Sequence, residues 1–154
     1  MSTLGELLVF AHVVAAAVVV GGGAVLLGLQ VRTLAAGDET LGRERAAAYM
    51  GTARWSTRAL ILPAAVVLLL AGAGAVEEIG FDFGDLWLII GTSVWMVLAL
   101  VIGPLHALFA RALRSALEVD WPSARRVLRR DTVLSSIELA LLIGVVWAMV
   151  AKPV

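Results

Sequence analysis

Three ionisable residues of this chain, His12, His106 and Glu138, lie within long apolar segments. An ionisable side chain inside a membrane-length apolar segment is energetically costly, so each of the three is a candidate functional residue. Imidazole can transfer a proton or ligate a metal or haem iron, and a carboxylate can bind a proton or pair with a base. The chemistry on offer is therefore proton handling, anion binding or haem ligation.

His106 and Glu138 are expected at matching depths, about 6 to 8 Å inside the same side of the membrane at a rise of 1.5 Å per residue. A carboxylate without a partner there would stay protonated, so we expect Glu138 to pair with Arg58 or His106. The expected intramembrane polar cluster consists of Arg58, His106, Glu138, Gln30 and Ser135. It is either a clamp that fixes helix positions or a proton-handling or anion-binding site.

His12 is expected about 8 Å inside the opposite side, on the helix stripe that contains Gly23. It either forms a hydrogen bond to a neighbouring helix or ligates a cofactor. His12 and His106 should lie roughly 15 Å apart along the membrane normal, so they cannot share one haem iron. Haem held by His12 alone stays open. Two histidines and no cysteine argue against a dedicated zinc site.

These residues are carried by an all-α polytopic membrane fold. The chain has 154 residues, 61% of them hydrophobic, and a mean hydropathy of +0.97, whereas soluble domains are roughly 45 to 50% apolar. Spanning a bilayer takes roughly 20 apolar residues. We expect one domain over residues 1–154, a bundle of four transmembrane helices at about 7–31, 59–76, 86–110 and 133–150.

The distribution of charge predicts the topology. Eleven of the twelve basic residues fall in residues 32–58 and 111–130, and the other is Lys152. Cytoplasmic loops are enriched in Lys and Arg, so both stretches should be cytoplasmic and both termini extracytoplasmic. The acidic segment 77–85 then connects two spans on the outside. The arginine-rich composition is typical of a bacterial protein, which predicts a multi-pass protein of the bacterial plasma membrane.

Small residues and prolines predict details of the bundle. Small side chains allow close approach of helices in lipid, where no hydrophobic force drives helices together. The expected contact stripes are Ala17, Gly21, Ala24 and Gly28 on the first span, and Ala64, Ala71, Gly72 and Ala75 on the second. Kinks are expected at Pro63 and Gly103-Pro104.

Several motifs together resemble a known family. They are Phe10-Ala11-His12-Val13-Val14, Gly21-Gly22-Gly23, Arg54-Trp55, Gly103-Pro104 and Met149-Val150-Ala151-Lys152-Pro153. Over nearly the whole chain they resemble a bacterial family of predicted four-helix integral membrane proteins, domain of unknown function 2269, which implies a membrane bundle without an assigned activity. The early histidine followed by small residues is also similar to the first helix of CopD-type domains and of haem-binding protoporphyrinogen oxidases. That resemblance implies haem b at His12.

Three functions remain open. The first is a non-enzymatic accessory membrane component that embeds in the bilayer and associates with itself or with a membrane partner. The second is a haem-binding redox protein using His12. The third is a proton or small-solute transporter whose cytoplasmic side contains Arg58, His106 and Glu138. No nucleic acid is expected as a partner, and no phosphate-binding loop, His-Glu-x-x-His or nucleophile elbow is present, so we expect no enzyme.

Overall fold

The protein is all-helical in a computed structural model that describes residues 2–82 and 84–151. Phe83, which falls in the acidic segment 77–85, and Lys152 and Pro153 lie outside the described residues. The described part is 93% helical and contains no strand. The predicted all-α class is confirmed.

In the described part of the chain, six α-helices and two short π-helical turns follow one another. They are α1 (Thr3–Leu34), α2 (Glu39–Ser56), η1 (Thr57–Ile61), α3 (Leu62–Ile79), α4 (Leu86–Val97), η2 (Leu98–Ile102), α5 (Gly103–Val119) and α6 (Trp121–Ala151). Because the π-turns join their neighbours without a break, the described chain forms four long helices that are apolar enough to cross a membrane: Thr3–Leu34, Glu39–Ile79, Leu86–Val119 and Trp121–Ala151. Each expected span falls within one of them.

Local sequence signals set the helix ends. The side chains of Ser2, Asp38 and Asp120 accept hydrogen bonds from backbone N–H groups three residues later, at 2.6 to 3.1 Å. Such caps satisfy donors that have no partner in the first turn of a helix. Gly80 ends α3 in the left-handed conformation, with a φ of 79°. A residue with a side chain would be strained at this φ, so glycine is favoured here.

The two predicted kinks correspond to the π-turns. In η1 the Leu62 N–H donates to the Thr57 carbonyl, and in η2 the Gly103 N–H donates to the Leu98 carbonyl, each five residues back. Pro63 and Pro104 directly follow these positions. A proline ring crowds the carbonyl four residues earlier and offers no N–H, so one wider turn relieves both problems.

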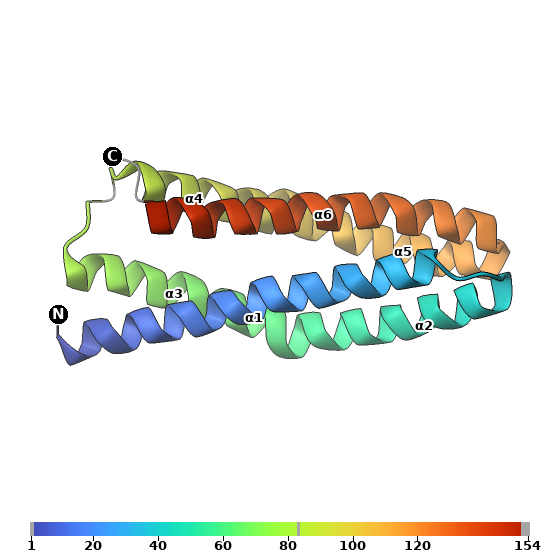
Figure 1. Cartoon of the computed structure of the whole chain (residues 1–154), viewed down its shortest axis with the longest axis horizontal. Coiled ribbons are helices and arrows are strands. Elements are labelled where there is room, and N and C mark those ends of the chain that lie inside the picture. Colours follow the sequence, from blue (N-terminus) through green and yellow to red (C-terminus); the bar gives the residue numbers. More distant parts are fainter. Residues whose placement is uncertain (1, 83, 152–154) are drawn as a thin grey trace.

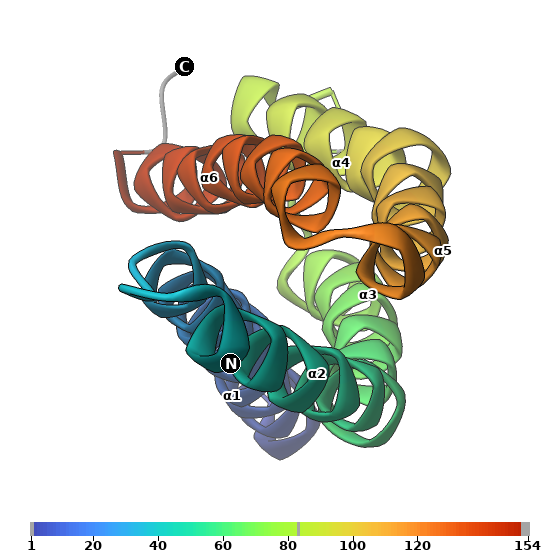
Figure 2. The same cartoon turned by 90° about the vertical axis from the view of Figure 1, so that its right-hand side faces the viewer.

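The four long helices form two hairpins that lie side by side (Figure 1). The first hairpin contains α1 to α3 and the second α4 to α6. α1 packs against α3 and α6, and α6 also packs against α4 and α5. Viewed along the bundle, α6 lies beside α1 and closes one side of the assembly (Figure 2). α6 is therefore the helix that connects the two hairpins.

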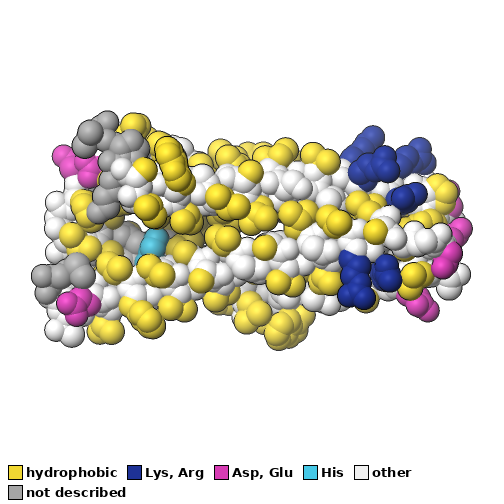
Figure 3. All heavy atoms as spheres, viewed as in Figure 1, with side chains coloured by type: hydrophobic (Ala, Val, Ile, Leu, Met, Phe, Trp, Pro, Cys, Tyr) yellow, Lys and Arg dark blue, Asp and Glu magenta, His cyan; other side chains and the backbone are white. Residues whose placement is uncertain are grey.

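Arginines gather at one end of the bundle, which we call the arginine-rich end (Figure 3). The α1–α2 and α5–α6 connections lie at this end, whereas α1 begins and α6 ends at the other (Figure 1). A small core packs here between α2, α5 and α6, built from Ala46, Leu113, Trp121, Ala124 and Leu128. Along the rest of the bundle many large apolar side chains are exposed, as expected of surfaces that face lipid.

Only one of the two predicted small-residue stripes lies in the α1–α3 contact. A Cβ at Gly74 would lie 3.2 Å from Leu8, and one at Gly72 would lie 2.8 Å from the His12 ring, so α3 uses its small residues there. On α1 the predicted stripe is exposed, and Gly22 faces Ile61 instead. The expectation for α1 was wrong because α1 meets α3 along the face that carries Leu8 and His12.

Candidate functional site

The buried carboxylate of Asp131 is the centre of a polar cluster near the arginine-rich end. Its side chain is 8% exposed. Oδ1 lies 2.6 Å from Nδ1 of His106 on α5, and Oδ2 accepts a hydrogen bond of 2.7 Å from Nε2 of Gln30 on α1. Asp131 thereby connects the two hairpins through a single side chain, since the hydrogen bonds to its two oxygens come from different hairpins.

Tyr49 on α2 is the second residue of the first hairpin that joins the cluster. Its hydroxyl accepts a hydrogen bond of 2.6 Å from Gln30 Nε2 and donates one of 3.2 Å to Asp131 Oδ2. Gln30 is 1% exposed, and its Oε1 is buried without a hydrogen-bond partner among the described residues. An unpaired buried acceptor of this kind can accept a hydrogen bond from a water molecule.

His106 is held between two carboxylates. Opposite Asp131, its Nε2 lies 3.0 Å from Oε2 of Glu138, which is on α6 two turns after Asp131. The exposed fractions of the side chains are 27% for His106 and 31% for Glu138. The Glu138 end of this bridge is therefore the accessible end, and the Asp131 end is closed.

The hydrogen bonds limit where the protons of the cluster can lie. With Asp131 ionised, a state in which its Oδ2 can accept from both Gln30 and Tyr49, the proton of the third contact lies on His106 Nδ1. The second bridge then needs one proton shared between His106 Nε2 and Glu138, either as imidazolium with carboxylate or as imidazole with carboxylic acid. Both forms leave a net charge of −1 on the three groups. Losing that proton would leave two lone pairs facing each other and a charge of −2.

The structure brings together three of the five residues expected in this cluster. His106 pairs with Glu138, and Gln30 joins them through Asp131. Arg58 is exposed and Ser135 is half-buried, and within the described residues neither side chain forms a hydrogen bond or an ion pair. Glu138 therefore pairs with the histidine, and not with Arg58.

Sequence reasoning missed Asp131 and Tyr49. Both lie in the charged or polar extensions of α6 and α2, where a solvated side chain is the usual expectation. One available signal was the spacing of seven residues between Asp131 and Glu138, which places both carboxylates on one face of α6. For Tyr49 no such local signal exists, because its partners come from α1 and α6.

His12 lies in a second polar contact, towards the other end of the bundle. Its Nδ1 lies 2.9 Å from the carbonyl oxygen of Leu68 on α3. A carbonyl only accepts, so Nδ1 carries the proton and Nε2 has a free lone pair when the ring is neutral. His12 and His106 belong to separate contacts. In the part of the chain that the structure describes, no group of three His, Asp or Glu side chains is arranged to hold a metal ion.

The fold defines a polytopic α-helical membrane protein with a buried polar cluster between its two hairpins. The sequence model of the family described as predicted integral membrane protein (DUF2269) matches residues 6–153. The chain therefore belongs to this family. No curated protein and no solved structure matches it.

Proposed function

We propose that this protein is a non-enzymatic component of the bacterial plasma membrane whose Asp131–His106–Glu138 cluster binds and releases a proton from the cytoplasmic side. The observation that carries the proposal is the position of His106 between two carboxylates, with two bridges that need two protons. The labile proton belongs to the His106–Glu138 bridge, because Asp131 also accepts hydrogen bonds from Gln30 and Tyr49.

Proton release would loosen the contact between helices. The groups that face His106 are Asp131 and Glu138 from α6, while Tyr49 from α2 and Gln30 from α1 face the same carboxylate of Asp131. Loss of the shared proton replaces an attractive bridge by repulsion in a poorly solvated place. The protonation state would thus set how tightly α5 is held to α6.

The chain has only two histidines, so selective ¹⁵N labelling of histidine gives a sharp test. His12→Gln assigns the remaining ring to His106. In vesicles, the His106 Nε2 resonance is expected to shift across a pH series that runs from acidic to alkaline, and to stay constant in Glu138→Gln. Glu118→Gln, an exposed carboxylate on α5, is the matched control. A His106 ring that stays constant over this range would show that the cluster is a static clamp.

Self-association is the second part of the proposal. On α1, the four small residues of the predicted stripe are all exposed: Ala17, Gly21, Ala24 and Gly28. A Cβ at Gly21 or Gly28 would have no neighbour within 4 Å. Stripes with this spacing let two helix backbones approach closely in lipid, so we propose that α1 of a second copy packs here. Cross-linking in vesicles would test it, with loss of the dimer expected in Gly21→Leu.

Transport is an alternative function that would use the same cluster. It requires that protons or a small solute cross the whole membrane, whereas reversible binding requires access from one side only. Vesicles that contain a pH-sensitive dye separate the two, because a transporter would dissipate an imposed pH gradient. Flux that disappears in Glu138→Gln while the protein stays folded would replace the binding proposal by the transport proposal.

Haem binding at His12 is a second candidate function, favoured by one observation. Metal-ligating histidines usually donate their other ring N–H to a carbonyl or carboxylate, as His12 Nδ1 does to Leu68, which would leave Nε2 as the ligand. Haem would supply one-electron chemistry. His12 would hold the iron without help from His106, because both ring nitrogens of His106 contact carboxylates.

A further inference from the structure

We propose that a pocket at the arginine-rich end binds the headgroup of an anionic phospholipid. The pocket has a volume of about 550 Å³ and is lined by Trp121, Pro122, Arg125, Arg126 and Arg129, all from the first turns of α6. Its lining contains three guanidinium groups and no carboxylate. This site is separate from the proton-binding cluster, and the inference does not depend on the proposed function.

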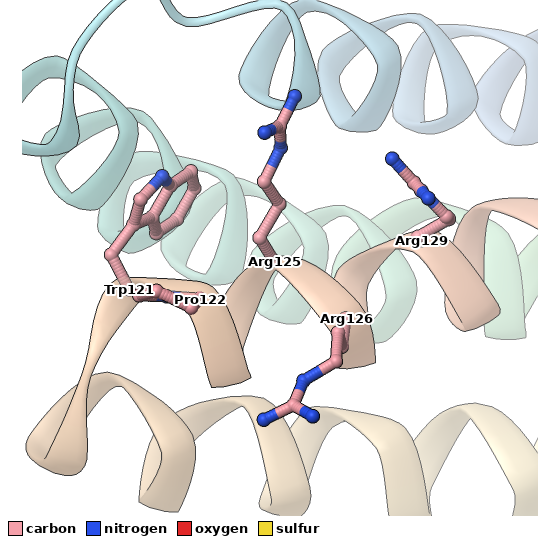
Figure 4. A pocket seen from close by; sticks show the side chains of 5 residues that line it. All are labelled: Trp121, Pro122, Arg125, Arg126 and Arg129. Carbon is pink, nitrogen blue, oxygen red and sulfur yellow. The ribbon is translucent and has the colours of Figure 1, made fainter.

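Two of the arginines and the tryptophan form a stripe along which one anion can bind. Trp121, Arg125 and Arg129 are spaced four residues apart, so they share one face of α6. Figure 4 shows Arg125 and Arg129 projecting from one side of the helix and Arg126 from the other. A phosphate between Arg125 and Arg129 would accept paired N–H donors, the geometry in which guanidinium binds phosphate best.

Among the described residues, the three arginines of the pocket form no ion pair. Arg125 donates to the carbonyl of Leu34 at 3.3 Å, and Arg126 donates to Ser123 Oγ at 3.0 Å; both acceptors are neutral. Arg129 forms no hydrogen bond or ion pair to any described residue. A guanidinium group has five N–H donors, so most donors of the pocket remain available for an anion.

One wall of the pocket is rigid. The indole of Trp121 is buried against Gly42 of α2, where an added Cβ would come within 2.4 Å of the ring. Because glycine has no side chain, the indole can pack directly against the backbone of α2 at Gly42. Arg125 and Arg129 lie one and two turns further along α6. The packing of Trp121 therefore fixes the start of the helix that carries them.

The depth of the pocket fits a lipid headgroup. Arg129 lies four residues, or about 6 Å, before the predicted apolar span of α6. The headgroup layer extends about 5 to 8 Å beyond the hydrocarbon core on each side. Basic clusters next to a transmembrane helix on the cytoplasmic side attract anionic lipids. A lipid whose tails lie along α6 would place its phosphate beside Arg129.

Lipid retention after gentle extraction tests the proposal. The protein is reconstituted into vesicles with equal amounts of phosphatidylglycerol and phosphatidylcholine, extracted in mild detergent, and analysed by native mass spectrometry. We expect enrichment of phosphatidylglycerol that falls about fivefold or more in Arg125→Gln/Arg129→Gln. The control is Arg111→Gln/Arg114→Gln, which removes the same charge from exposed positions of α5 outside the pocket. An equal fall in both variants, or no enrichment in the wild type, would overturn the proposal.

Two further arms keep the result interpretable. Arg129→Gln alone removes no hydrogen bond within the described protein, so it should fold normally and still reduce the enrichment. The second arm compares inorganic phosphate with short-chain phosphatidylglycerol as stabilisers of the detergent-solubilised protein. The lipid should raise Tm in an Arg129-dependent way, and phosphate should not. An equal, Arg129-dependent effect of phosphate would assign the pocket to a free anion and overturn the assignment to lipid.

Discussion

Gly72 on α3 lies directly against the imidazole of His12 on α1, so close that a Cβ at position 72 would come within 2.8 Å of the ring. The ring is also fixed by its hydrogen bond to Leu68. A side chain at position 72 therefore cannot be accommodated without moving the ring and breaking that bond. This contact fixes the position of α1 along α3.

Gly72→Ala is expected to destabilise the protein by about 1 to 3 kcal/mol, the usual cost of overpacking. The free energy of unfolding in mixed micelles measures the effect. Gly144→Ala on α6 is the matched control, because a Cβ at this exposed glycine meets nothing within 4 Å. If both variants are equally stable, the His12 ring is not held as the structure has it.

Asp131→Asn should lower the free energy of unfolding by about 3 kcal/mol, because His106 then lacks its buried counter-charge. The amide keeps the size of the side chain but cannot accept at both ends. Denaturant titration in micelles provides the measurement. Glu44→Gln, at an exposed position of α2, should change the stability by less than about 0.5 kcal/mol. A similar small change for Asp131→Asn would exclude a central role for this carboxylate.

Glu138→Gln should preserve the fold and abolish the pH response of the cluster. An amide N–H can donate permanently to His106 Nε2, so the bridge no longer depends on a titrating proton. Protection factors of the α5 amides, which correct hydrogen exchange for its intrinsic dependence on pH, should differ above and below neutral pH in the wild type and agree in the variant. A wild-type difference that persists in Glu138→Gln would place the titrating group elsewhere.

Asp120 gives the α5–α6 connection a separate pH dependence. Hydrogen bonds from the backbone and the hydroxyl of Ser123 lower the pKa of this exposed carboxyl below its ordinary value. A lowered pKa contributes stability above about pH 4 that is lost as the pH falls through the folded-state pKa. Local protection of the start of α6 should therefore decrease in acid. Asp120→Asn retains a capping side chain without the charge, so its protection should not respond to acid.

An absorption spectrum tests haem at His12. Protein expressed with ample haem precursor and purified in mild detergent is recorded oxidised and then reduced. On the haem hypothesis a Soret band shifts on reduction and is absent in His12→Ala, while Gly144→Ala retains it. A spectrum with tryptophan absorption alone, in protein that remains folded, would remove this candidate and leave His12 as a helix-to-helix contact.

The sequence was enough to predict the four long helices, because the length and hydrophobicity of a segment can be read from that segment alone. The kinks at Pro63 and Pro104 were predictable for the same reason, although not their form as π-turns. The pairing of His106 with Glu138 could be expected from matched depths along their helices. Depth does not specify rotation, however, so Arg58 at a similar depth was expected in a cluster that it does not join. Asp131 and Tyr49 could not be placed because their burial results from packing between distant helices.

The position of Asp131 has a consequence for biosynthesis. Its partners Gln30 and Tyr49 precede it by 101 and 82 residues, so the first three spans have been synthesised before Asp131 is translated. Until then Gln30 and Tyr49 lack the acceptor that they share in the finished bundle. Assembly of the two hairpins must therefore follow insertion of the last helix, and a nascent chain that stops before α6 would expose these polar groups to the quality-control machinery of the cell.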